Sequence, residues 1–191
     1  MTRASVALCL SSSLGLFGCV TTPAKEVRSN VDTMKKEQQP DKLFARGKAF
    51  AQVGDLTRAE QYLSAALDAG GDESKILPLL VMVCVDGKRY RVAIDYAEGS
   101  LKHHPEDTHL RYLVGTLYLA TGDAEAARAS FEQVLKMRPD DAETHYALGV
   151  VYRDDEHDLL QADAHFRVYL NLDPNGVHVD DARASLLKSV P

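Results

Sequence analysis

The chain has 191 residues, of which 45% are hydrophobic and 26% are charged, so it can form one compact domain or a short repeat array. Its composition is neither disordered nor fibrous in type. Aromatic residues that favour strands are scarce, with no Trp and five Phe, which favours helix over sheet. The formal net charge is -6 and Lys and Arg do not cluster, which disfavours nucleic-acid binding because phosphates require a basic patch.

The N-terminal segment has the pattern of a secretory signal. A short start that contains Arg3 precedes an apolar, Ser-rich stretch over residues 4–17, and Gly18 and Cys19 form a small-residue cleavage site. This stretch is too short to be a permanent membrane span. We therefore expect residues 1–18 to be an export signal whose removal changes the net charge from -6 to -7, because Arg3 is the only charge removed.

Residues 16–19, Leu-Phe-Gly-Cys, resemble the lipobox of bacterial lipoprotein signal peptides. The resemblance implies that Cys19 is lipidated after cleavage before it. The residue directly after the Cys is Val20 and not Asp, which resembles lipoproteins that are sorted to the outer membrane. The expected location is therefore that membrane, facing the periplasm. Phe17 is bulkier than the usual small residue, and the alternative is ordinary signal cleavage nearby with Cys19 as a free thiol.

Residues 19–39 are interpreted as the lipidated Cys and a flexible tether. Val27, Val31 and Met34 form only a thin apolar stripe at helical spacing, too narrow to pack well. As a flexible coil the segment would have an end-to-end distance of about 25 Å, enough to hold a domain just off a membrane surface.

Cys84 is the one cysteine of the expected mature domain, so no disulfide can form within it. It follows an apolar run over residues 79–83, and a free Cys in such a place usually acts as a small hydrophobic residue. The sequence therefore predicts that Cys84 is a core residue and not a nucleophile.

From Pro40 onward the sequence repeats with a period of 34 residues. The recurring positions are Gly47, Val81, Gly115 and Gly149, then Phe50, Cys84, Tyr118 and Tyr152, then Leu67, Leu101 and Leu135. The pattern resembles the tetratricopeptide repeat (TPR), a helix-turn-helix unit. The resemblance implies an all-α fold, a right-handed α-α superhelix with four repeats over 40–73, 74–107, 108–141 and 142–176. Residues 177–191 are expected to form a C-terminal capping helix, with Val179, Ala182, Leu186 and Val190 on one face.

Small residues are predicted to set the packing within each repeat. Gly47, Gly115 and Gly149 should let the first helix approach the surface of the second at Ala59, Ala127 and Ala162. In repeat two Val81 takes the place of Gly, so we expect a wider helix separation there. Pro78 is expected in the first turn of its helix, where a missing amide is tolerated.

The turns inside the repeats carry Gly54, Gly87 and Gly122, which are expected to take positive φ, while Asp55 and Asp123 should cap the next helix. The fourth turn, Asp154 to Asp158, is one residue longer, so Ala162, Phe166 and Pro174 arrive one position late. Its carboxylates, with His165, are also the best candidates for a metal site. We favour a solvated loop, because the turn lacks the Gly and the alternate spacing of a calcium loop.

The resemblance implies that three positions of each first helix line a concave groove. The fifth position holds Phe44, Pro78, Tyr112 and Tyr146 in the successive repeats. The candidate partner-binding residues are Phe44, Lys48, Met82, Val85, Tyr112, Thr116, Leu119, Tyr146, Val150 and Arg153. Apart from Lys48 and Arg153 the set is not basic, and it does not reproduce the Lys, Asn and Arg pattern of carboxylate-clamp TPRs. It suits an apolar extended or helical segment. The alternative is that these side chains are packed between neighbouring helices as core.

No catalytic or phosphate-binding motif is present in the sequence, so we expect no enzyme activity, cofactor, metal or small-molecule substrate. Similar TPR lipoproteins serve as pilotins of pilus secretins, in gliding-motility complexes and as adaptors of envelope enzymes. The resemblance implies a scaffold or assembly factor that binds other cell-envelope proteins and meets the membrane through the lipid on Cys19. The alternative is an accessory subunit of a trans-envelope machine, held by its convex face.

Overall fold

The computed structural model describes residues 38–188, so the signal segment, Cys19 and most of the tether lie outside the described residues. The helices follow in the order α2 (Pro40–Gln52), α3 (Leu56–Asp68), α4 (Glu73–Asp86), α5 (Tyr90–Leu101), α6 (Thr108–Ala120), α7 (Ala124–Met137), α8 (Ala142–Val150), η1 (Val151–Asp155), α9 (Leu159–Leu172) and α10 (Val179–Ala184).

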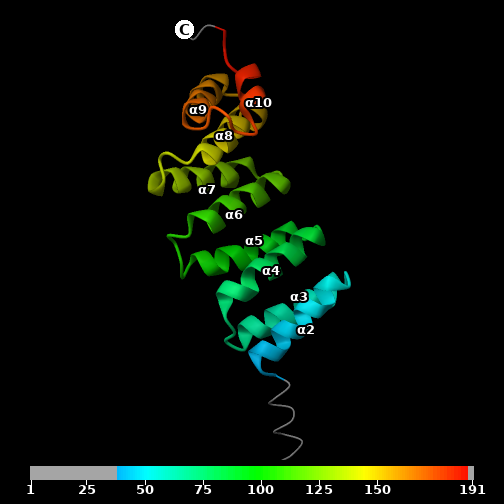
Figure 1. Ribbon diagram of the computed structural model, residues 1–191. Coiled ribbons are helices and arrows are strands. Elements are labelled where there is room, and N and C mark those ends of the chain that lie inside the picture. The colour runs from blue at the N-terminus through cyan, green and yellow to red at the C-terminus, as the bar shows by residue number, and fades with distance from the viewer. Residues whose placement is uncertain (1–37, 189–191) are drawn as a thin grey trace, which may run out of the picture. The chain divides into compact units, whose positions relative to one another are not determined.

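Successive helices pair as α2 with α3, α4 with α5, α6 with α7 and α8 with α9, and each pair stacks on the next (Figure 1). No strand occurs among residues 38–188, and the all-α prediction is confirmed. In the same part of the chain no helix is both long and apolar enough to cross a membrane. Between pairs, the second helix of one contacts the first helix of the next, as α3 does α4, α5 does α6 and α7 does α8.

Glycine permits close approach of the two helices in repeats one, three and four. A Cβ atom on Gly47, Gly115 or Gly149 would lie 2.7 Å from Leu63, 2.5 Å from Phe131 and 2.6 Å from Phe166, respectively. All three of these large side chains are fully buried. The predicted close approach is therefore confirmed, but the residue that faces each glycine is the large side chain four residues after the expected alanine. The contact between Gly149 and Phe166 also confirms that the fourth repeat contains one extra residue.

Repeat two exchanges the sizes of the two facing residues. Val81 on α4 takes the place of the glycine, and Ala97 on α5 stands where Leu63 and Phe131 stand in the neighbouring repeats. Val81 and Ala97 are both buried. Since a larger residue on one helix is matched by a smaller one on the other, the volume of the pair is largely conserved. Ala97 therefore relieves part of the crowding that Val81 would cause. Helices α4 and α5 still contact each other less extensively than the helices of the other three pairs, in line with the wider separation expected there.

Two of the three expected glycine turns are found. Gly54 and Gly122 have φ of 77° and 78°. Asp55 and Asp123 accept hydrogen bonds from backbone amides three residues later, at 3.0 and 3.1 Å, as predicted for caps. The expectation for Gly87 was wrong, because its φ is -77° and the positive φ of 56° falls on Lys88. Lys88 is the residue 34 positions from both Gly54 and Gly122, so the glycine stands one residue too early.

Replacing Lys88 with glycine should therefore stabilise the protein. A left-handed conformation costs a residue with a Cβ roughly 1–2 kcal/mol, which Lys88→Gly removes, and Lys88 is exposed. We expect a gain of about 1 kcal/mol in the free energy of unfolding, measured by urea denaturation. Gly122→Ala is the matched control, because its added Cβ has open space around it and should cost a similar amount through φ alone. A destabilised Lys88→Gly variant would contradict this account.

Pro78 lies deeper in its helix than expected. Because α4 begins at Glu73, Pro78 falls in the second turn and not in the first. Proline has no amide hydrogen, so the ordinary helical bond to the carbonyl of Ser74 is not made. Burial of apolar side chains on several sides of α4, among them Ile76 and Leu80, offsets this loss. Cys84 on the same helix is fully buried, as predicted, and burial raises the pKa of its thiol to about 11.

The C-terminal helix is shorter than the sequence suggested. Helix α10 has six residues, and Val179 and Ala182 bury themselves in one apolar cluster with side chains of α9. Leu186 packs against this cluster from outside the helix. The amide of Leu187 donates to the carboxylate of Asp163 at 2.8 Å instead of continuing the helix. The capping helix expected within residues 177–191 therefore covers only Val179–Ala184, and residues 189–191 lie outside the described part.

Candidate functional site

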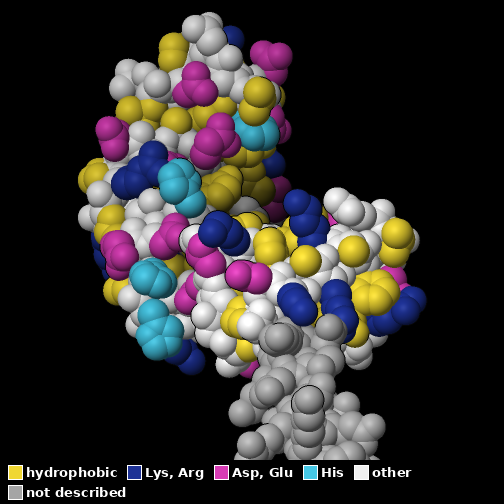
Figure 2. Space-filling model, turned by 60° about the horizontal axis from the view of Figure 1, so that its bottom comes forward, with side chains coloured by type: hydrophobic (Ala, Val, Ile, Leu, Met, Phe, Trp, Pro, Cys, Tyr) yellow, Lys and Arg dark blue, Asp and Glu magenta, His cyan; other side chains and the backbone are white. Residues whose placement is uncertain are grey.

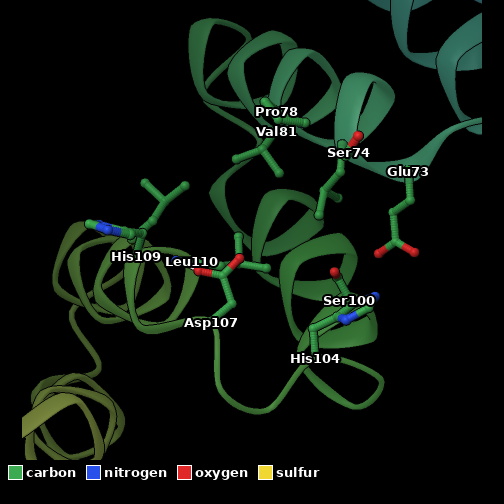
Figure 3. Close-up of a pocket in the computed structure, with 11 residues that line it drawn as sticks. Glu73, Ser74, Pro78, Val81, Ser100, His104, Asp107, His109 and Leu110 are labelled. Carbon is green, nitrogen blue, oxygen red and sulfur yellow. Dashed lines mark hydrogen bonds between the residues drawn. The ribbon is translucent and has the colours of Figure 1, made fainter. Parts of the chain in front are cut away.

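A cavity of about 490 Å³ opens between α4 and α6, beside the C-terminal end of α5 (Figure 3). Pro78 and Val81 of α4 lie on one side of it, and Leu110 of α6 lies on the other. The apolar lining is Leu77, Pro78, Val81, Leu110 and Leu113, and the polar lining is Glu73, Ser74, Ser100, His104, Asp107 and His109. The cavity is thus an apolar recess with a polar rim, the usual make-up of a binding site.

The cavity lies beside Pro78, at the fifth position of the first helix, where the other three repeats carry an aromatic residue. In repeat three Tyr112 holds this position, and its ring centroid lies 5.4 Å from that of Phe131. In repeat four Tyr146 holds it, 5.8 Å from Phe166. Repeat two has Pro78 there, which is too small to fill the same space.

The surroundings of Tyr112 show where a ring at residue 78 would lie. Burial raises the pKa of Tyr112, and the nearby carboxylates of Glu143 and Asp141 raise it further. These two residues stand 34 positions after His109 and Asp107, which line the cavity. Tyr112 therefore occupies, one repeat later, the space that is open beside Pro78.

The predicted groove residues do not line this cavity. Lys48 and Met82 are exposed, and the remaining members of the set are partly buried. Phe44 and Val85 pack against the buried core of the first repeats. The hydroxyl of Thr116 donates to the backbone carbonyl of Leu113 at 2.7 Å. Of the residues at the fifth position, Pro78 alone lines the cavity. The sequence could have indicated this cavity, because the series of aromatic residues at the fifth position is interrupted at Pro78.

The groove positions of repeat four contact the C-terminal segment. The ring of Tyr146 stacks on His178, with centroids 4.0 Å apart and planes at 6°. Its hydroxyl donates to Asp181 at 2.9 Å, and burial together with this bond raises its pKa to about 12. Arg153 donates to Asp181 at 3.0 Å and to Ser185 at 2.6 Å. The chain itself therefore occupies this end of the predicted groove.

Three carboxylates of the acidic turn form contacts within the protein, those of Asp154, Glu156 and Asp158. The extra residue is absorbed in η1, a π-helical turn. Asp154 pairs with Arg153 at 2.7 Å, and Glu156 pairs with Arg128 of α7 at 2.6 Å. Asp158 accepts from two backbone amides at the start of α9. Among residues 38–188 no three His, Cys, Asp or Glu side chains are grouped so that they could hold a metal ion.

Two histidines join α8 to α9 within the fourth repeat. The Nδ1 atoms of His145 and His165 lie 3.0 Å apart, and Nε2 of His145 lies 2.9 Å from the carbonyl oxygen of Pro139. Burial, followed by the charge of His145, lowers the pKa of His165 to about 4. His165 is therefore neutral at physiological pH, and the pair acts as a packing contact within the repeat.

Charged side chains of both signs are interspersed on the face shown in Figure 2, with hydrophobic side chains between them. A recess is visible on this face, and hydrophobic side chains lie within it. This mixture does not resemble the single-sign basic surface of nucleic-acid-binding proteins.

Comparison with known proteins identifies the fold. A family model for the tetratricopeptide repeat matches residues 85–151, and a tetratricopeptide repeat protein from Parabacteroides merdae superposes with a TM-score of 0.68 at 21% identity, covering 76% of this chain and 58% of its own. The chain carries a TPR fold. The cavity therefore lies between the first helices of its second and third TPRs.

Other TPR structures agree. YrrB, described as a TPR protein with an unusual peptide-binding site, superposes with a TM-score of 0.65 at 18% identity, covering 83% of this chain and 88% of its own. MamA from Desulfovibrio magneticus gives a TM-score of 0.60 at 23% identity, with 74% and 80% covered.

One curated relative was found by sequence. The chain is 22% identical over 136 residues to anaphase-promoting complex subunit 3 of Schizosaccharomyces pombe. The match includes 71% of this chain but only 20% of that protein, so the chain spans about a fifth of the relative's length.

Proposed function

We propose that this chain is a protein-binding scaffold that takes a large apolar or aromatic side chain of a partner segment into the cavity between α4 and α6. One observation carries the proposal. The cavity is the space that the chain fills with Tyr112 one repeat later, so its shape already suits a ring. An anchor side chain in a desolvated pocket is the usual source of affinity in such complexes.

The rim of the cavity favours a particular type of partner segment. Its described lining includes the carboxylates of Glu73 and Asp107 and no Lys or Arg. The carbonyl of Ser74 lacks its ordinary helical donor because of Pro78. Acceptors therefore outnumber charged donors around the apolar recess, which suits a segment whose apolar anchor is flanked by amide donors or basic residues and disfavours an acidic one.

The experiment that tests this function fills the cavity without unfolding the repeat. We expect a side chain that occupies the recess to weaken binding of a partner segment roughly thirtyfold, and a small side chain at the same residue to preserve it. If both kinds of variant bind alike, the cavity is not the binding site.

The sequence pattern of the N-terminus supports a location for this scaffold. We propose that Cys19 is lipidated and tethers the repeats to the outer membrane on its periplasmic side, where the chain serves as an assembly factor for envelope complexes such as pili, secretins or motility machines. The support is the positive start, the apolar stretch and the Leu-Phe-Gly-Cys sequence at residues 16–19.

Substitution of the proposed lipid attachment site should release the protein from membranes. The parent chain should partition into detergent and sediment with outer membranes, whereas Cys19→Ser should leave a soluble periplasmic or an unprocessed protein. A single acyl chain binds bilayers weakly, so stable attachment requires the several chains that bacterial lipoproteins carry. Cys9→Ser, in the same signal segment, is the control and should behave like the parent. Equal solubility of the parent and Cys19→Ser would rule out the lipid anchor.

A further inference from the structure

The outer face of α9 is apolar, unlike that of the other second helices. Leu160, Ala164, Val168 and Leu172 follow one another at intervals of four residues, and all are exposed. The equivalent residues are Thr57, Gln61, Ala65 and Ala69 on or beside α3, Arg91, Asp95, Gly99 and His103 on or beside α5, and Glu125, Ala129, Gln133 and Met137 on α7. The exposed fractions of Leu160, Val168 and Leu172 are 51%, 38% and 38%. The repeat pattern therefore does not require these large apolar side chains.

This face is symmetric about its midpoint. Phe166 is fully buried, and the exposed face lies on the opposite side of the helix at the same level. Counting outward from residue 166, Ala164 matches Val168, and Leu160 matches Leu172. Gln161 and Asn171, both exposed amides, match in the same way. A helix with such a sequence can meet an antiparallel copy of itself with like residues in register.

The charges of α9 also permit self-association. The helix carries a single acidic and a single basic residue, Asp163 and Arg167, which pair with each other at 2.6 Å. The equivalent faces of α5 and α7 present charged residues such as Asp95 and Glu125. Identical surfaces that carry net charge repel each other, and the chain as a whole has a net charge of -6. The outer face of α9 avoids this repulsion.

We propose that the outer face of α9 binds a second copy of this chain through a two-fold, antiparallel contact. Ala164 faces Val168 of the second copy, and Leu160 faces Leu172 of the second copy. The small side chain of Ala164 near the axis lets the two helices approach closely. Rows of residues four apart interdigitate in the commonest class of helix packing, with a crossing angle of about -50°. The contact is independent of the cavity between α4 and α6, so each copy keeps its own binding site.

The contact is small, which predicts a reversible dimer. Four helical turns span about 20 Å, and a single such face buries less area than the roughly 1,200 Å² of a standard stable interface. The dimer should therefore form at protein concentrations of about 10–100 µM and dissociate on dilution.

Sedimentation velocity of the full chain over this concentration range tests the proposal. Cys19→Ser is used as the background so that a lipid at residue 19 cannot cause association. We expect a concentration-dependent dimer. Ala164→Glu should weaken it at least tenfold, because each carboxylate would then face Val168 of the other copy and the pair of carboxylates would lie near the axis. Ala129→Glu, at the equivalent residue of α7, is the matched control and should leave the dimer unchanged.

A compensating change tests the antiparallel register. Adding Val168→Lys to Ala164→Glu places a lysine opposite each glutamate, so the double variant should recover most of the lost association. All these residues are exposed, and far-UV circular dichroism should show unchanged helicity. A parent chain that stays monomeric throughout overturns the proposal. Equal effects of Ala164→Glu and Ala129→Glu, or a double variant no better than Ala164→Glu, also overturn it.

Discussion

Gly115→Val should destabilise the third repeat strongly, and combining it with Phe131→Ala should cost clearly less than the sum of the two single losses. A Cβ on Gly115 would lie 2.5 Å from the Phe131 ring, so valine forces α6 and α7 apart. Overpacking of this kind costs about 1–3 kcal/mol, and removal of a buried Phe alone costs about 3–5 kcal/mol. The double variant recreates the arrangement of repeat two, where Val81 accompanies Ala97. We therefore expect the two losses not to add.

Urea denaturation of the parent, the two single variants and the double variant measures this coupling. Residues in direct contact commonly show interaction energies of 0.5–3 kcal/mol, and we expect a value of about 2 kcal/mol or more here. Some loss remains in the double variant, because Tyr112 packs on Phe131 and loses that support. Since each repeat depends on its neighbours, the transition should stay a property of the whole array. Strictly additive losses would show that a larger residue at 115 is not accommodated by a smaller residue at 131.

The repeat pattern predicted those features that depend on a single recurring contact. Glycine at residues 47, 115 and 149 stands against a large buried side chain in each case, and the shift of the fourth repeat by one residue places Phe166 correctly. Asp55 and Asp123 cap the helices that follow them. Such positions are readable because one residue type meets one geometric need wherever the repeat recurs.

Departures from the pattern were harder to interpret from sequence. Val81 departs from the glycine of the other repeats, and the small residue that accompanies it, Ala97, lies on a different helix. The left-handed conformation was predicted for Gly87 because glycine favours it, but the structure places it one residue later, at Lys88. At Lys88 the register of the repeat, and not the residue type, sets the left-handed position.

The candidate site required the structure. A cavity is defined by what is missing, and the loss of the ring at Pro78 matters only because Leu110 and Leu113 on the next first helix leave its space open. At the other end of the array, Tyr146 and Arg153 resemble groove residues until α10 is seen to contact both. The sequence therefore predicted the helices that carry the site but not which positions are free to bind.

Pro78→Tyr should close the cavity with a side chain that the fold already accommodates elsewhere. The tyrosine would lie as Tyr112 does one repeat later, with Asp107 and His109 in place of Asp141 and Glu143. Loss of a buried anchor commonly costs 2 kcal/mol or more, so partner affinity should fall roughly thirtyfold. Because a proline inside a helix costs about 3 kcal/mol, the variant should be more stable than the parent, and unfolding cannot explain lost binding.

Pro78→Ala is the matched control, since it removes the same proline and leaves the recess open. The decisive measurement is the Kd of one peptide, selected from a random library on the parent chain, for the parent, Pro78→Ala and Pro78→Tyr by fluorescence anisotropy. The account predicts a peptide with a large apolar or aromatic anchor that binds the parent and Pro78→Ala with similar affinity and Pro78→Tyr roughly thirtyfold more weakly. Equal affinity for all three proteins would contradict the claim that the cavity between α4 and α6 is the binding site.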